Sequence, residues 1–229
     1  MCYIRHMRKD LLVNGEIYHI FTRSIADYRV FNNRNEFERM RRLIKYYSAN
    51  TKIKFSDFMA LKLVNNVGFD KGYETLLQNK DQLVQIIAYC FMPTHIHLAL
   101  KQIALNGISK YIKVVLDSYT RYFNSLHKRK GPLWESRFNN VLVRSDEQLL
   151  HLTRYIHLNP VTAFLVKKPE DWLFSSYKEY LSDADKNQSE KMCQFIDILE
   201  IQPTLYSKFV NDRISYQREL AKIKNLLLE

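Results

Sequence analysis

Residues 84–101 read VQIIAYCFMPTHIHLALK, two apolar segments that meet at Pro93. The first segment runs from Val84 to Cys90 and the second from His95 to Lys101. Only four residues separate them, so the connection must be tight. The stretch therefore predicts a pair of neighbouring antiparallel strands joined at Pro93.

Two more strands are predicted outside this pair. Residues 15–24 follow a turn at Gly15 and are rich in β-branched and aromatic residues, which is typical of a strand. Residues 138–143 predict another short strand.

Three amphipathic helices are predicted between the strands, because apolar residues recur there at helical spacing. We expect Ser109 to cap the second helix and Asp146 to cap the third, which Pro160 should end. The predicted ranges are Asn35 to about Ala49, Ser109 to about His127, and Asp146 to roughly Leu158. Strands that alternate with helices in this way predict the α+β class, with one antiparallel sheet and helices packed on it.

Two regions carry less information. Residues 51–82 predict one helix around 54–65 followed by polar loops. Residues 182–190 resemble a polar linker, and two helices are expected after it.

The charge of the chain favours an anionic partner. Its 229 residues include 35 Lys and Arg against 24 Asp and Glu, a formal charge of +11 with a pI near 9.5. Nucleic acid is the commonest partner of such a chain. A generally basic, soluble surface is the alternative, and charge alone does not decide between them.

Other compositional features exclude several classes. The five glycines form neither GxGxxG nor GxxxxGK[ST], which excludes kinases and dinucleotide-dependent dehydrogenases. No apolar run approaches the roughly 18 residues of a membrane span, and the charged start is not that of a signal peptide. The three cysteines are widely scattered, at positions 2, 90 and 193, so we expect reduced cytosolic thiols.

His95 and His97 form the first candidate site. Alternate residues of a strand point to the same face, so both imidazoles can approach one divalent cation. Two half-buried histidines with ordinary hydrogen bonds would give the same pattern.

Tyr155 and Asn159 form the second candidate site. Residues four apart on a helix share a face, so these two side chains lie together, with His151 one turn earlier, while His157 points away. A phenol beside a bound cation is a plausible nucleophile towards phosphorus. Packing on the core is the alternative for Tyr155, one of 15 tyrosines.

Several blocks in this order resemble the HUH single-tyrosine transposases, in their REP-associated tyrosine transposase-like branch. Thr94 stands where this family commonly has Asn, and Glu135 where it has Gln. The matching blocks are Tyr89 to Leu98, Ser118 to Asn124, Gly131 to Phe138, Arg154 to Val161, Pro169 to Trp172 and Ser175 to Tyr177, with Tyr18, His19 and Phe31 fitting the opening strand.

The resemblance implies a ferredoxin-like sheet with helices on one face. It implies a catalytic domain over residues 1–181, with an insertion at about 51–82, and a small C-terminal helical extension over 182–229. It also implies a bacterial, cytoplasmic protein, associated with the nucleoid when bound to DNA.

The activity that the resemblance implies is cleavage and rejoining of single-stranded DNA beside a hairpin. Tyr155 would be the nucleophile, and His95, His97 and Asn159 would hold Mg²⁺ or Mn²⁺, of which Mn²⁺ suits two imidazoles better. The products would be a 5′-phosphotyrosine and a free 3′-OH, formed by a monomer or a homodimer without ATP.

Candidate phosphate contacts follow from the basic residues near these blocks. They are Arg121, Lys128, Arg129, Lys130 and Arg137, with Arg5, Arg8 and Lys9 near the start of the chain. Two rival functions remain. One is a domesticated hairpin-binding protein that does not cut, against which the intact His95, His97 and Tyr155 argue. The other is a metal-dependent hydrolase that uses HxH on a different fold, such as a β/α barrel, which is hard to build from 229 residues with five glycines and a single HxH strand.

Overall fold

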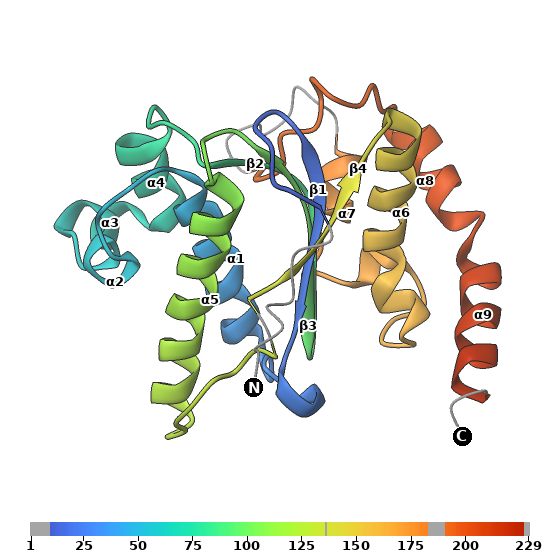
Figure 1. The fold of residues 1–229 in the computed structure, drawn as a ribbon, viewed down its shortest axis with the longest axis horizontal. Coiled ribbons are helices and arrows are strands. Elements are labelled where there is room, and N and C mark those ends of the chain that lie inside the picture. The colour runs from blue at the N-terminus through green and yellow to red at the C-terminus, as the bar shows by residue number, and fades with distance from the viewer. Residues whose placement is uncertain (1–9, 136, 183–190, 227–229) are drawn as a thin grey trace, which may run out of the picture.

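The computed structural model describes residues 10–135, 137–182 and 191–226. Its centre is one antiparallel sheet of four strands in the order β2-β3-β1-β4 (Figure 1). The strands are β1 (Ile17–Arg23), β2 (Val84–Met92), β3 (His95–Gln102) and β4 (Asn139–Val143). All four predicted strands are therefore present, and β2 and β3 form the predicted hairpin, with Met92 opposite His95.

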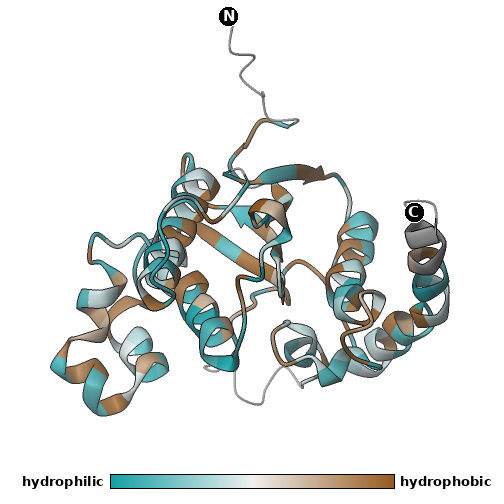
Figure 2. Ribbon diagram, turned by 90° about the horizontal axis from the view of Figure 1, so that it is seen from below, coloured by the Kyte–Doolittle hydropathy of each residue, from teal (hydrophilic) through white to brown (hydrophobic). Residues whose placement is uncertain are grey.

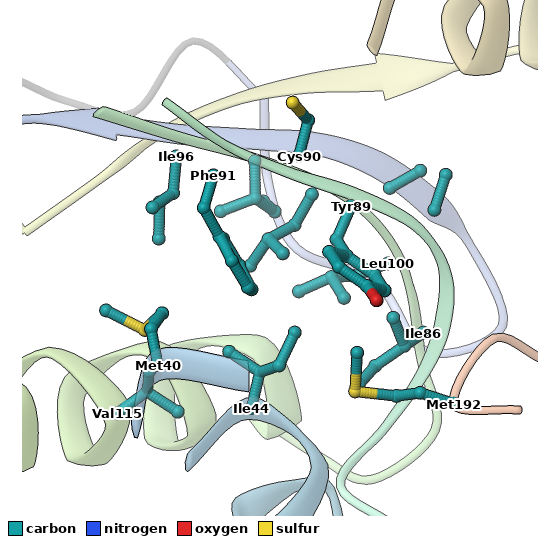
Figure 3. Packing of buried hydrophobic residues seen from close by; sticks show 14 of the residues in the cluster. Met40, Ile44, Ile86, Tyr89, Cys90, Phe91, Ile96, Leu100, Val115 and Met192 are labelled. Atoms are coloured by element: carbon teal, nitrogen blue, oxygen red, sulfur yellow. The ribbon is translucent and has the colours of Figure 1, made fainter. Parts of the chain in front are cut away.

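The helices α1 (Arg34–Ser48) and α5 (Gly107–Leu126) cover one face of this sheet (Figure 1). The chain order β1-α1-β2-β3-α5-β4 with this strand order is the predicted ferredoxin-like topology. Figure 3 shows Met40, Ile44 and Val115 from the two helices facing side chains of β2 and β3. Apolar burial between these layers is the main source of stability for the fold.

The helix α6 (Asp146–Thr162) packs on the other face of the sheet, against β2 and β3 (Figure 1). The prediction that helices lie on one face only is therefore wrong. A strand covered on both faces has a nearly continuous apolar run instead of an alternating one. The sequence of β2 is such a run, and Figure 2 shows hydrophobic strands between the helix layers.

Three predicted helix boundaries are wrong. The helix α5 begins at Gly107 after Asn106, two residues before Ser109, and Gly107 is required there because a Cβ would collide with the Leu83 carbonyl oxygen. The cap of α6 is Ser145, whose hydroxyl accepts a hydrogen bond from Gln148 N at 3.1 Å. Pro160 lies inside α6, near its end, where a proline removes only one backbone hydrogen bond.

Residues 51–82 contain three short helices instead of one helix and loops. They are α2 (Phe55–Met59), α3 (Lys62–Val67) and α4 (Phe69–Leu77). Gly68 separates the last two with φ of +84°, a conformation that side chains rarely adopt. The ring of Phe58 packs against Tyr46 of α1, and the Lys45 ammonium lies 2.7 Å from the Asp70 carboxylate. These three helices are thus held against α1 by apolar contacts and an ion pair.

The C-terminal part packs beside α6 (Figure 1). It contains α7 (Tyr177–Leu181), α8 (Pro203–Asn211) and α9 (Ile214–Leu226). Cys90 and Cys193 are buried free thiols, as predicted for two of the three cysteines, while Cys2 lies outside the described residues. Within the described residues, no helix combines the length and apolar character needed to cross a membrane.

Candidate active site

Three histidines lie on the sheet face that α6 covers. His95 and His97 are alternate residues of β3, and His19 lies on the neighbouring strand β1. The strand register places Phe21 opposite His97 and Ala99 opposite His19. The ring centroid of His97 lies 5.0 Å from that of His95 and 5.2 Å from that of His19. The structure therefore brings the two predicted histidines together, with a third beside them.

Each histidine of the predicted pair uses Nδ1 for a hydrogen bond. Nδ1 of His95 lies 3.0 Å from the Thr94 hydroxyl, and Nδ1 of His97 lies 3.0 Å from His19 Nε2. In the described part of the chain, Nε2 of His95 and Nε2 of His97 make no hydrogen bond. Both Nε2 atoms are therefore available to a cation.

Tyr155 is held over this cluster by α6. Its ring meets the ring of His97 edge to face, with centroids 5.6 Å apart, and that of His19 at 5.9 Å. The side chain is 46% exposed. The predicted nucleophile thus lies beside the histidines and within reach of solvent.

Asn159 lies one turn further along α6 and is half-buried. Its side-chain amide donates a hydrogen bond to the Tyr155 carbonyl oxygen at 3.0 Å. The nitrogen of the amide is therefore occupied by the helix backbone, and the oxygen is the atom that suits a cation.

The protonation states suit metal binding. Burial lowers the pKa of His19 to about 4, and burial together with the nearby Arg23 cation lowers that of His95 to about 4. Burial lowers the pKa of His97 well below the usual value, and its histidine neighbours add to this. The three rings are therefore neutral at pH 7, and neutrality is what metal binding requires of His95 and His97.

Burial has the opposite effect on the pKa of the Tyr155 hydroxyl. Burial raises its pKa above 10, and the side chain of Asn159 opposes this only in part. At pH 7 the phenol is protonated, so it needs a cation nearby to act as a nucleophile.

Two other histidines of α6 lie outside the cluster. His151, predicted on the face of Tyr155, is exposed, with Nδ1 2.7 Å from Arg154 and its ring against Phe209 of α8. His157 is fully buried, and its nitrogens lie 2.7 Å from the Tyr206 hydroxyl and 2.8 Å from the Ser176 hydroxyl. It points away from Tyr155, as helical geometry predicts.

The candidate DNA contacts are distributed over three places. Arg121 lines a hollow of about 610 Å³ with Arg39 and Lys54. Arg137 lines another of about 460 Å³, between α5 and the chain leading to β4. Lys128, Arg129 and Lys130 are in the turn after α5. The candidates near the start of the chain, Arg5, Arg8 and Lys9, lie outside the described residues.

Within that turn, Arg129 differs from its neighbours. Its guanidinium donates hydrogen bonds to the Asn124 side-chain oxygen at 3.1 Å and to the Pro132 carbonyl oxygen at 2.8 Å. Lys128 and Lys130 lie on either side and are both exposed, whereas Arg129 is half-buried. Arg129 therefore holds the turn together.

His19 is the residue of this cluster that the sequence analysis did not assign to the site. The sequence did place His19 on one face of its strand, the face that it shares with Ile17 and Phe21. Whether that face is the one that carries His95 and His97 depends on the pairing of β1 with β3, which the sequence pattern did not give.

Residues 69–159 match the family described as Transposase IS200 like. The matched segment includes the histidine pair, Tyr155 and Asn159. A Haemophilus influenzae protein whose name assigns it, without proof, as a REP-associated tyrosine transposase is 32% identical to this chain over 104 residues. The aligned residues are 41% of this chain and 58% of that protein. The aligned part thus spans less than two-thirds of that relative.

A solved structure of a REP-associated tyrosine transposase bound to a REP hairpin has a similar fold. The TM-score is 0.51 at 16% sequence identity, over 76% of this chain and 84% of the other. This structural likeness supports the α+β fold. The similarity to transposases rests on the two sequence matches. Over residues 69–159 the chain is therefore similar to the IS200-like transposases, the family that its sequence motifs resemble.

Proposed function

We propose that the chain is a metal-dependent transposase that cleaves and rejoins single-stranded DNA next to a hairpin. The observation that carries the proposal is the position of Tyr155. Its phenol lies edge-on to His97, beside two imidazoles whose Nε2 atoms are unoccupied in the described chain.

The proposed donor atoms are of the kinds that a divalent cation takes in proteins. Among the described residues, no group of three or more His, Cys, Asp or Glu side chains is arranged for a metal. The proposed set combines Nε2 of His95, Nε2 of His97 and, as the resemblance implies, the amide oxygen of Asn159. Two nitrogens and one oxygen suit Mn²⁺ somewhat better than Mg²⁺, which prefers oxygen. A bound cation would offset negative charge on the reacting phosphate and lower the barrier to attack.

The side chain of Tyr155 performs the covalent step. Its Oη forms a bond to the phosphorus of a phosphodiester and gives up its proton, while the bond from phosphorus to the 3′ oxygen breaks and that oxygen takes up a proton. The products are a 5′-phosphotyrosine and a free 3′-OH. The reverse step joins strands without ATP, because the energy of the phosphodiester is kept in the phosphotyrosine.

The proposed substrate follows from charge and from the solved relative. A net charge of +11 favours nucleic acid, and the relative's structure holds a REP hairpin. An exposed phenol over a sheet face suits a single strand beside a folded stem better than continuous duplex.

The proposal can be tested with labelled hairpins that carry single-stranded flanks. Incubation with the protein and Mn²⁺, followed by a denaturing gel, should give a band of protein bound covalently to DNA. Omission of the metal, or a fully paired duplex of the same sequence, should abolish the band. Hairpin binding without any covalent product under all metal conditions would contradict cleavage and favour the non-cutting hairpin-binding protein.

A further inference from the structure

His19 and His97 share one hydrogen bond between ring nitrogens. His19 Nε2 lies 3.0 Å from His97 Nδ1, and the rings are nearly parallel, with planes 21° apart. A hydrogen bond requires a proton on one of these nitrogens and a lone pair on the other. The proton is therefore on His97 Nδ1 or on His19 Nε2.

The two arrangements have different consequences for the proposed metal site. If His97 donates, its Nδ1 holds the proton and its Nε2 keeps a lone pair. If His19 donates, Nδ1 of a neutral His97 accepts and its proton is on Nε2, where it blocks a cation. Only the first arrangement allows His97 to bind metal through Nε2.

The surroundings of His19 keep its ring in place. Its strand pairs with β3 on one side and β4 on the other. The ring of Phe21 lies at 4.9 Å and the edge of Tyr155 at 5.9 Å. His19 thus lies between Phe21, His97 and Tyr155, in a position fixed by the sheet.

We propose that His19 is a positioning residue, which accepts a hydrogen bond from His97 Nδ1 and so keeps His97 Nε2 free for the cation. This inference rests on the proposed function. Thr94 has the corresponding place beside His95, where its hydroxyl contacts Nδ1 at 3.0 Å. In both His95 and His97, Nδ1 has a hydrogen-bond partner and Nε2 has none among the described residues. The partners differ, because one is a hydroxyl group and the other an imidazole nitrogen.

Two variants of similar shape separate acceptance of a hydrogen bond from packing. In His19→Gln the amide oxygen can replace Nε2 as acceptor. In His19→Met a side chain of similar length has only a weak sulfur acceptor. Calorimetry with Mn²⁺ on the full chain measures affinity, and long-range ¹H–¹⁵N spectra without metal report which nitrogen of His97 carries its proton. The His97→Ala spectrum assigns the signals.

We expect His97 in the wild type to carry its proton on Nδ1, and His19→Gln to keep this state and the Mn²⁺ affinity. His19→Met should lose the Nδ1 preference and bind Mn²⁺ about 10-fold to 100-fold more weakly, the usual effect of removing such a partner. A proton on Nε2 in the wild type would overturn the proposal, as would full affinity in His19→Met. An equal loss in both variants would also overturn it, because His19 would then act through its ring.

An error in the proposed metal site would give a different result from an error in the role of His19. If His95→Ala binds Mn²⁺ as tightly as the wild type, the metal site is wrong. The position of the His97 proton is measured without metal, so it still tests the relationship between His19 and His97.

Discussion

Tyr155 and His97 meet edge to face, with their ring planes at 85° and their centroids 5.6 Å apart. One ring comes from α6 and the other from the second strand of the central hairpin. The contact exists because α6 packs on the sheet face that carries the histidines.

Replacing Tyr155 with Phe should abolish the covalent adduct with DNA. The change removes only the hydroxyl of a half-exposed side chain, so the free energy of unfolding should change by less than about 0.5 kcal/mol. Tyr28 is also 46% exposed, and Tyr28→Phe is the matched control that should retain the adduct. Peptide mass mapping of the trapped complex locates the bond. An adduct that persists in Tyr155→Phe would refute this assignment.

His95→Ala and His97→Ala should each lower the affinity for Mn²⁺ by at least about 10-fold and abolish cleavage. Each change removes one of the two unoccupied Nε2 atoms, while hairpin binding through phosphate contacts should persist. Calorimetry and gel-shift assays measure the two effects separately. His151→Ala is the control, because that exposed ring contacts Arg154 and Phe209 instead. Unchanged Mn²⁺ binding in the double mutant would exclude the pair as ligands.

The stability of the fold should fall as the pH is lowered from 7 to 5, and His157 should account for about 2 kcal/mol of this. Burial lowers the pKa of His157 to about 3. Below about pH 6.5 the unfolded chain binds a proton on this ring and the folded chain does not, so stability is lost as the pH falls through this window.

Urea unfolding at several pH values measures the effect of His157. His157→Gln should have a shallower dependence on pH than the wild type, whatever its absolute stability. Identical slopes for wild type and His157→Gln would show that His157 does not contribute.

Neutralising Lys128 and Lys130 together should weaken hairpin binding and reduce its salt dependence by one to two units of the log–log slope. A double change of Lys62 and Lys80 to Gln removes the same charge from the region of α3 and α4 and is the control. Arg129→Gln should instead lower the free energy of unfolding by about 1–2 kcal/mol, since it removes hydrogen bonds that hold the turn. If the slope changes only with Arg129, the phosphate contact lies on that residue.

Local patterns in the sequence were enough to predict the hairpin of β2 and β3 and the four strands. Alternation placed His95 and His97 on one face, and helical spacing placed Tyr155 with Asn159. Each of these relationships depends on residues that are close in the chain. The helices within residues 51–82 were harder to predict, because the break between α3 and α4 depends on one glycine, Gly68.

Relationships between distant segments could not be predicted in the same way. The contact of His19 with His97 depends on the register of β1 against β3. The place of His151 was predicted from its helix alone, yet its ring packs on Phe209 of α8, which the helix pattern does not show. Pairing and packing of this kind are set by the whole core.

Helix α6 has two chemically opposite sides. Tyr155 is on the solvent-accessible side, and His157, two residues later, is fixed among Tyr206, Ser176 and the rings around them. Substitutions around position 155 would therefore leave this anchor intact, while changes in α8 would act on α6 through the contact of His157 with Tyr206. In an evolving lineage, change on the exposed side and loss of the buried anchor would be separate events on this helix.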